Sequence, residues 1–134
     1  MGKRNTARRL AVQALYQADL SHEIIDQALD NIVESEDFIP ETKKFASQLA
    51  KSAWDKREEI DKIISKMAID WPLERIGKVD RAILRLSLAE LAVAETPVSV
   101  IINEAVELAK KYSSPEAAKF INGILGAFVR KKDV

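Results

Sequence analysis

The stretch VDRAILRLSLAELAVAE, residues 79–95, constrains the fold more than any other part of the sequence. Its apolar residues are distributed nearly all the way around a helix rather than along one stripe: Ile83, Leu84, Leu86, Leu88, Leu91 and Val93. Such a helix has to be covered by other elements, because only the interior of a domain removes all of its faces from water. We therefore predict that this segment is a central, mostly buried helix.

Polar residues interrupt this helix at a few positions, including Asp80, Arg81, Arg85 and Glu90. Arg81 and Arg85 are one helical turn apart and therefore share a face. Charged side chains are rarely buried without a partner, so we predict that both arginines pair with carboxylates and take no part in chemistry.

The other segments also repeat their apolar residues at helical spacing. This pattern covers residues 10–16, 24–33, 42–68, 99–113 and 113–132, and no strong strand pattern or fixed-period repeat is present. Four glycines and four prolines are too few for a turn-rich β protein. Because 134 residues is the length of one ordinary domain, we predict a single all-α domain over residues 1–134.

Particular residues indicate where these helices begin and end. Asn5 or Thr6 can cap the first helix, and Ser114 can cap the last one. The charged DKREE, residues 55–59, is either a turn between two helices or the exposed face of one long helix. DWPLERIG, residues 70–77, places a proline and a glycine at the ends of a short helix or 3₁₀ turn.

The chain begins MGKRNTARRL, which places four positive charges in its first nine residues, at the start of a predicted helix. A helix N-terminus is already positive, so Arg8 and Arg9 there are unfavourable by roughly a few tenths of a kcal/mol each. Their removal is therefore predicted to be neutral or slightly stabilising for the fold. Free N–H groups and clustered arginines together suit a phosphate, and a solvated terminus is the alternative interpretation.

Charge is unevenly distributed along the chain although the net charge is zero. No lysine or arginine occurs between Arg9 and Lys43, an interval that holds eight acidic residues. Basic residues gather at the N-terminus, at Lys110–Lys111 and at residues 130–132. If the two ends and the Lys110 region meet in space, the domain has one basic face for a polyanion. The alternative is the mixed charge of ordinary surface helices.

The sequence lacks the motifs of common enzyme and metal sites. Its glycines do not form a phosphate-binding loop, cysteine is absent, and the single histidine, His22, has no partners for a zinc site or a catalytic triad. No apolar run reaches membrane-spanning length, and no signal peptide is visible. We expect a cytoplasmic binding protein that has no cofactor, metal or membrane association and is not an enzyme.

Aromatic residues lie near two of the basic clusters. Tyr16 follows the N-terminal arginines, and Phe120 follows Lys119 near the other end. Exposed aromatic rings beside cations can stack on the unpaired bases of single-stranded RNA. The alternative is that both rings belong to the core.

Four stretches resemble, in order and at matching separations, the NusB family of bacterial transcription antitermination factors: ARRLAVQALYQADL, GKVDRAILRLSLAEL, VIINEAVELAKKY and KFINGIL. The resemblance covers nearly the whole chain. It implies an all-α fold of two small helical bundles packed together. It also implies binding to ribosomal protein NusE, to the boxA element of nascent ribosomal RNA transcripts, and to a transcription elongation complex with other Nus factors.

The resemblance further implies which residues bind these partners. It assigns to the RNA surface eight residues from both parts of the chain: Arg4, Arg8, Arg9, Tyr16, Glu116, Lys119, Phe120 and Asn122. Tyr16 is placed to contribute to the RNA or the partner surface. Asp80 matches an acidic position near the NusE interface.

Two alternatives stay open. A related domain forms the N-terminal part of some ribosomal RNA cytosine methyltransferases, which would require this chain to be a fragment. A pure protein-interaction module, with an incidental basic end, is the other. An RNA-binding protein should lose affinity steeply as salt rises, whereas an interaction module should show no RNA binding to lose.

Overall fold

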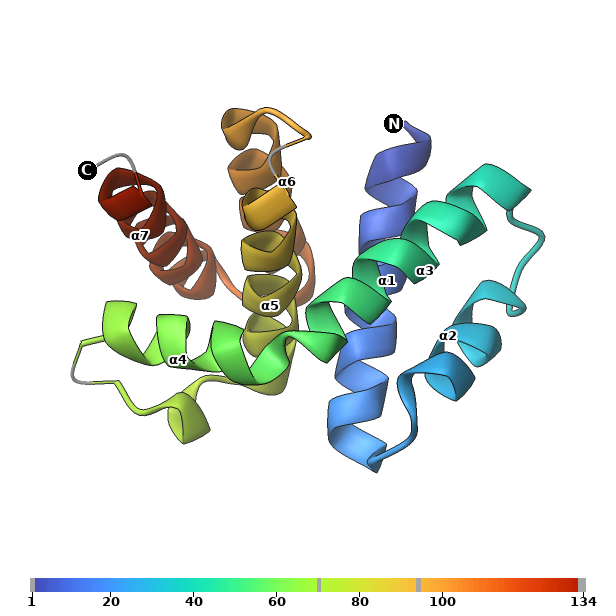
Figure 1. Cartoon of the computed structure of the whole chain (residues 1–134), viewed down its shortest axis with the longest axis horizontal. Helices are drawn as coiled ribbons and strands as arrows, with labels where there is room; N and C mark the ends of the chain where they lie inside the picture. The colour runs from blue at the N-terminus through green and yellow to red at the C-terminus, as the bar shows by residue number, and fades with distance from the viewer. Residues whose placement is uncertain (1, 70, 94, 133–134) are drawn as a thin grey trace.

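The computed structural model describes residues 2–69, 71–93 and 95–132. Over these residues the chain is helical, with short connections and no strand. The elements in chain order are α1 (Lys3–Ser21), α2 (Ile25–Val33), α3 (Pro40–Asp55), α4 (Arg57–Met67), the 3₁₀ turn η1 (Leu73–Arg75), α5 (Lys78–Val93), α6 (Val98–Tyr112) and α7 (Pro115–Lys132) (Figure 1). The all-α prediction is confirmed.

Two groups of helices meet at α5. Helices α1, α2 and α3 pack on one another, and α1 and α3 also contact α5. On its other side α5 contacts α4, α6 and α7 (Figure 1). The expected pair of small bundles is therefore present, with α5 between them.

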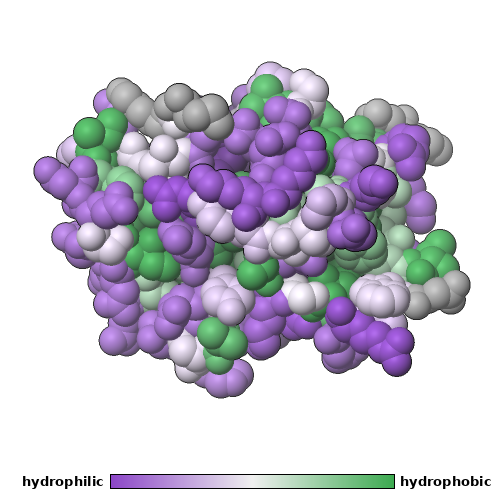
Figure 2. All heavy atoms as spheres, turned by 180° about the vertical axis from the view of Figure 1, so that it is seen from behind, coloured by the Kyte–Doolittle hydropathy of each residue, from purple (hydrophilic) through white to green (hydrophobic). Residues whose placement is uncertain are grey.

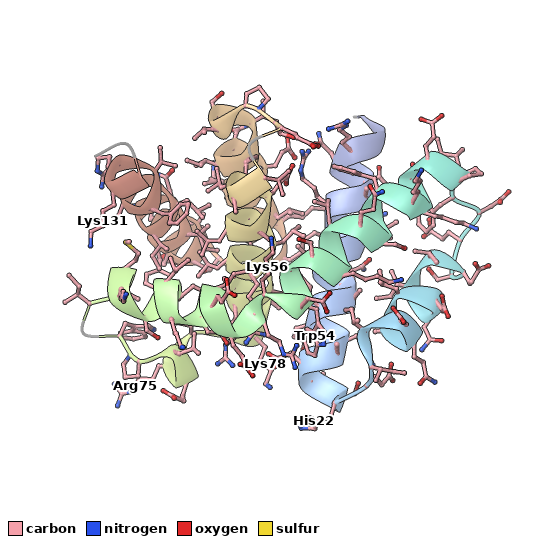
Figure 3. The ribbon with its side chains drawn as sticks, viewed as in Figure 1. His22, Trp54, Lys56, Arg75, Lys78 and Lys131 are labelled. Atoms are coloured by element: carbon pink, nitrogen blue, oxygen red, sulfur yellow. The ribbon has the colours of Figure 1, made fainter. Side chains whose placement is uncertain are left out.

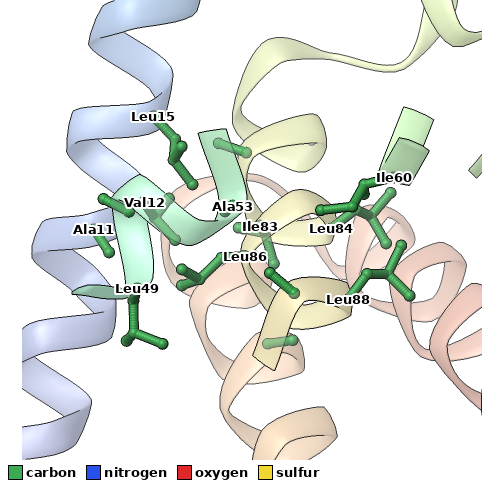
Figure 4. Packing of buried hydrophobic residues seen from close by; sticks show 14 of the residues in the cluster. Ala11, Val12, Leu15, Leu49, Ala53, Ile60, Ile83, Leu84, Leu86 and Leu88 are labelled. Carbon is green, nitrogen blue, oxygen red and sulfur yellow. The ribbon is translucent and has the colours of Figure 1, made fainter. Parts of the chain in front are cut away.

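The core confirms the central position of α5. Ten consecutive residues of this helix, 82–91, are buried. Leu84 lies toward Ile60 of α4, and Leu86 lies on the opposite side of α5, toward Val12 of α1 (Figure 4). Val93, which was predicted to be part of this surface, is half exposed because the last turn of α5 extends beyond the core.

The helix boundaries agree with the sequence in part. The DKREE segment is a turn, since α3 ends at Asp55 and α4 begins at Arg57. The Ser114 hydroxyl oxygen accepts a hydrogen bond of 3.0 Å from the backbone N–H of Ala117, which confirms the predicted cap. The capping prediction for Asn5 or Thr6 is wrong, because α1 begins earlier and Gly2 is its N-cap.

Helix α1 ends at His22, which adopts the left-handed conformation with φ 62°. Its backbone N–H donates to the carbonyl of Ala18 at 3.0 Å. Glycine or asparagine is more usual at such a position, so this role of His22 could not be predicted from its residue type.

The face opposite to that of Figure 1 is largely polar. Figure 2 shows hydrophilic side chains over most of it, with hydrophobic groups scattered among them. Within the described ranges, no helix combines the length and the apolar character needed to cross a bilayer.

Candidate nucleic-acid interface

A groove separates α1 from α6, since both helices pack on α5. It consists of two adjoining hollows of about 460 and 270 Å³ that share Arg9, Leu108 and Tyr112 as lining residues. We call it the α1–α6 groove. Its full lining is Asn5, Thr6, Arg9, Val12, Gln13 and Tyr16 from α1, Val79 from α5, and Glu104, Glu107, Leu108, Lys110, Lys111 and Tyr112 from α6.

The groove combines positive charge with aromatic rings. Arg9, Lys110 and Lys111 supply the cations, and Tyr16 and Tyr112 supply the rings. The Lys111 ammonium lies 5.4 Å from the centre of the Tyr112 ring, and that ring is 42% exposed. Cations that bind phosphates beside rings that stack on bases are the usual means of holding an unpaired nucleic-acid strand.

Two carboxylates, Glu104 and Glu107, also line the groove and reduce its positive charge. The Lys110 ammonium lies 3.6 Å from a Glu107 carboxylate oxygen, and both side chains are more than half exposed. The Lys111 ammonium lies beside the Tyr112 ring. An exposed ion pair of this kind is weak, so both lysines keep the freedom to bind an external anion.

The basic clusters meet only in part. The N-terminal cluster and the Lys110 region come together in the groove, through Arg9, Lys110 and Lys111. The C-terminal end of α7 lies on the far side of the molecule from the start of α1 (Figure 1), and Lys131 is found there in Figure 3. One basic face therefore includes the start of the chain but not its end.

The three predicted arginines occupy three different environments. Arg9 is partly exposed in the groove, and its Nη1 donates to Gln13 at 3.4 Å. Arg4 is exposed, with its guanidinium carbon 4.7 Å from the centre of the Phe45 ring on α3. Arg8 is only 4% exposed.

Arg8 forms a buried ion pair with Glu90 of α5. Its Nη2 lies 2.6 Å from the Glu90 Oε2, and its Nε donates to Oε1 at 2.9 Å. This pairing contradicts the premise that Arg8 is an unpaired cation whose removal is neutral or slightly stabilising. We expect its loss to destabilise the fold, because Glu90, 6% exposed, would remain as an uncompensated buried charge. Its side chain points into the protein and not into the α1–α6 groove, so the geometry does not support a direct RNA contact.

The four predicted residues of α7 do not line the groove. Glu116, Lys119 and Asn122 are exposed, whereas Phe120 is partly buried against the core. Tyr112, at the end of the groove, precedes Glu116 by four residues, so their Cα atoms are at most about 15 Å apart. A strand of a few nucleotides leaving the groove could therefore reach the start of α7.

Asp80, the predicted partner residue, lies partly buried in the first turn of α5. A carboxylate is favourable there because the helix N-terminus is positive. Its Oδ1 is buried and has no hydrogen-bond partner within the described part of the chain.

The arginines of α5 pair with carboxylates, as predicted. Arg85 donates from Nε and Nη2 to the two carboxylate oxygens of Asp61 at 2.8 and 2.7 Å. The Asp19 Oδ2 of α1 lies 3.9 Å from the Arg81 Nη1 and also 3.9 Å from the Lys78 Nζ. Figure 3 shows Lys78 where α1 and α5 approach each other. These pairs link α5 to α4 and to α1.

The sequence analysis missed Tyr112 as a groove residue. A signal was available, because this exposed aromatic directly follows two lysines at the end of α6. It also missed Phe45, whose contact with Arg4 depends on the packing of α3 against α1. In the ranges that the structure covers, no group of three or more histidines or carboxylates could hold a metal ion.

Comparison with known proteins identifies close relatives. The model of the NusB family matches residues 5–130. The transcription antitermination protein NusB of Bacillus subtilis (strain 168) is 44% identical over 124 residues, which cover 92% of both proteins. A chain in a crystal structure of antitermination factors NusB and NusE in complex with dsRNA superimposes with a TM-score of 0.89, at 34% identity and over 98% of each chain. A chain in a crystal structure of a plectonemic RNA supercoil gives a TM-score of 0.93 at 33% identity, over 100% of this chain and 99% of that one.

Proposed function

The chain belongs to the NusB family, and from that premise we propose that it is a transcription antitermination factor that binds RNA together with ribosomal protein NusE. The relative in the NusB–NusE–dsRNA crystal structure supports both partners. The proposal extends to the boxA element as the RNA and to a cytoplasmic elongation complex with other Nus factors. It includes no catalysis, and it treats residues 1–134 as one domain.

The observation that carries RNA binding is the α1–α6 groove. It brings Arg9, Lys110 and Lys111 together with two tyrosines, although these residues come from opposite ends of the sequence. We assign the phosphates of the RNA to the three cations, and the bases to Tyr16 and Tyr112. Arg4, exposed at the start of α1 beside Phe45 of α3, and the exposed residues at the start of α7 extend this surface.

NusE is assigned to the surface around Asp80. The Asp80 residue is partly exposed at the start of α5, so a donor from a docked protein could bind its carboxylate. The assignment separates the partner surface, at the start of α5, from the cationic end of the groove.

The test is a titration of a boxA RNA oligonucleotide and a scrambled control, each with and without NusE. The proposal predicts tighter binding of boxA, and an affinity that falls with salt. Three phosphate contacts on a single strand correspond to a slope of about −2 in a plot of log affinity against log salt concentration. Equal binding of both RNAs would refute boxA specificity, and no binding of either would favour a pure protein-interaction module.

A further inference from the structure

The guanidinium of Arg8 is enclosed by residues from three helices. On α5, Glu90 accepts hydrogen bonds from Nε and Nη2 at 2.9 and 2.6 Å. Within α1, the Asn5 Oδ1 accepts a bond of 3.0 Å from Nη1. On α3, the ring of Phe45 has its centre 5.8 Å from the guanidinium carbon. All of these contacts are made by the first two turns of α1, so they fix how this end of the helix sits on α3 and α5.

The residues around this pair are those proposed to meet RNA. Arg4 shares the Phe45 ring with Arg8 and lies one turn before it on α1. Arg9 follows directly and lines the α1–α6 groove, as does Asn5. The buried pair therefore anchors the helical turn of α1 that carries Arg9 and follows the turn that carries Arg4.

Glu90 also controls the local charge. Arg4 and Arg8 are four residues apart on one face of a helix, where like charges repel each other. Glu90 neutralises the buried Arg8, so Arg4 can remain over Phe45 at 4.7 Å. The contribution of Arg8 to RNA binding would then come from geometry, since its own charge is already compensated.

We propose that Arg8 and Glu90 are positioning residues for RNA binding, which hold Arg4 and Arg9 in place without touching the RNA. This inference rests on the proposed function. If a buried pair already holds the exposed arginines in place, RNA binding loses less conformational entropy in ordering them.

Glu90→Gln tests the proposal because charge and position predict opposite results. Removing a negative charge near the RNA surface should strengthen RNA binding if electrostatics alone decides. Loss of positioning should weaken binding of a boxA oligonucleotide, by about threefold to thirtyfold, while the salt slope stays unchanged. The affinities are measured well below the melting temperature, with circular dichroism to verify that the variant is folded. Should this variant not fold, Arg8→Lys replaces it, since lysine keeps the charge but loses the forked geometry.

Asp61→Asn is the matched control. Asp61 accepts the same two-pronged bond from Arg85 of α5, at 2.8 and 2.7 Å, but it lies on α4 and lines no part of the groove. We expect this variant to be less stable than the parent and to bind boxA with unchanged affinity. Equal weakening in both variants would show a general effect of lost stability and would overturn the proposal.

The remaining outcomes distinguish a failure of the positioning role from a failure of the proposed function. Unchanged or tighter RNA binding by Glu90→Gln, with normal binding by the parent, would overturn the positioning role alone. Failure of the parent protein to bind RNA would refute the proposed function itself.

Discussion

Replacing Arg8 by methionine is expected to destabilise the protein by about 3–5 kcal/mol, the usual effect of removing one partner of a buried ion pair. The structure places the site in this range because the side chains of Arg8 and Glu90 are 4% and 6% exposed. Little water can therefore reach the Glu90 carboxylate to take the place of the lost guanidinium. The Asn5 side chain would lose a hydrogen bond as well.

The double variant Arg8→Met/Glu90→Leu removes both charges and should recover most of the lost stability, because an apolar pair of similar volume can replace a buried ion pair at little net cost. Urea unfolding followed by circular dichroism measures all three proteins. In thermal unfolding, a domain of this size should melt roughly 11–18 °C lower in the single variant than in the parent.

Lys43→Met serves as a control for an exposed pair, since Lys43 lies 3.7 Å from Glu34 and both remain accessible to water. Its effect should be below about 1 kcal/mol. A single Arg8→Met variant within 1 kcal/mol of the parent, or a double variant no more stable than the single one, would refute the reasoning from burial.

Three further predictions concern the groove, the core and the partner surface. Arg9→Ala should weaken RNA binding and reduce the salt slope by about 0.7, with a change in stability of less than about 0.5 kcal/mol. Filter binding at several salt concentrations measures this, with Lys131→Ala, at the far end of α7 (Figure 3), as the control. An unchanged slope would exclude a phosphate contact. Leu84→Ala should destabilise the fold by about 2–5 kcal/mol by leaving a cavity, and a melting temperature within a degree of the parent would show that α5 is not central. Asp80→Arg should weaken the binding of NusE in calorimetric titrations and leave residual RNA binding, so normal NusE affinity would place the partner surface elsewhere.

The fold could be predicted from the sequence because its main determinants are local. Residues 79–95 are apolar around the whole helix, so a central position follows from their composition alone, and α5 has that position. The cap at Ser114 was also predictable, since the hydroxyl bonds three residues further along the chain. Local spacing was sufficient in both cases.

The candidate site was predictable only in part because it depends on contacts between distant residues. Arg8 and Glu90 are 82 positions apart, and nothing near either residue indicates that they meet. Without that contact, all three N-terminal arginines look equally available to RNA. Tyr112 reaches the groove only because α6 runs beside α1 over α5, which is a property of the packing.

The most direct test of the account is the coupling between RNA and NusE, measured around a complete cycle. Titrations at fixed salt give the affinity of the protein for boxA RNA with and without NusE, and for NusE with and without boxA RNA. The groove offers three cations beside two carboxylates, so binding of RNA to the protein alone should be modest. When NusE is docked near Asp80, RNA bound to one protein meets the other in an intramolecular step. This should tighten RNA binding by about tenfold to a hundredfold. RNA must then tighten NusE binding by the same factor. Equal boxA affinity in the presence and absence of NusE would contradict the account.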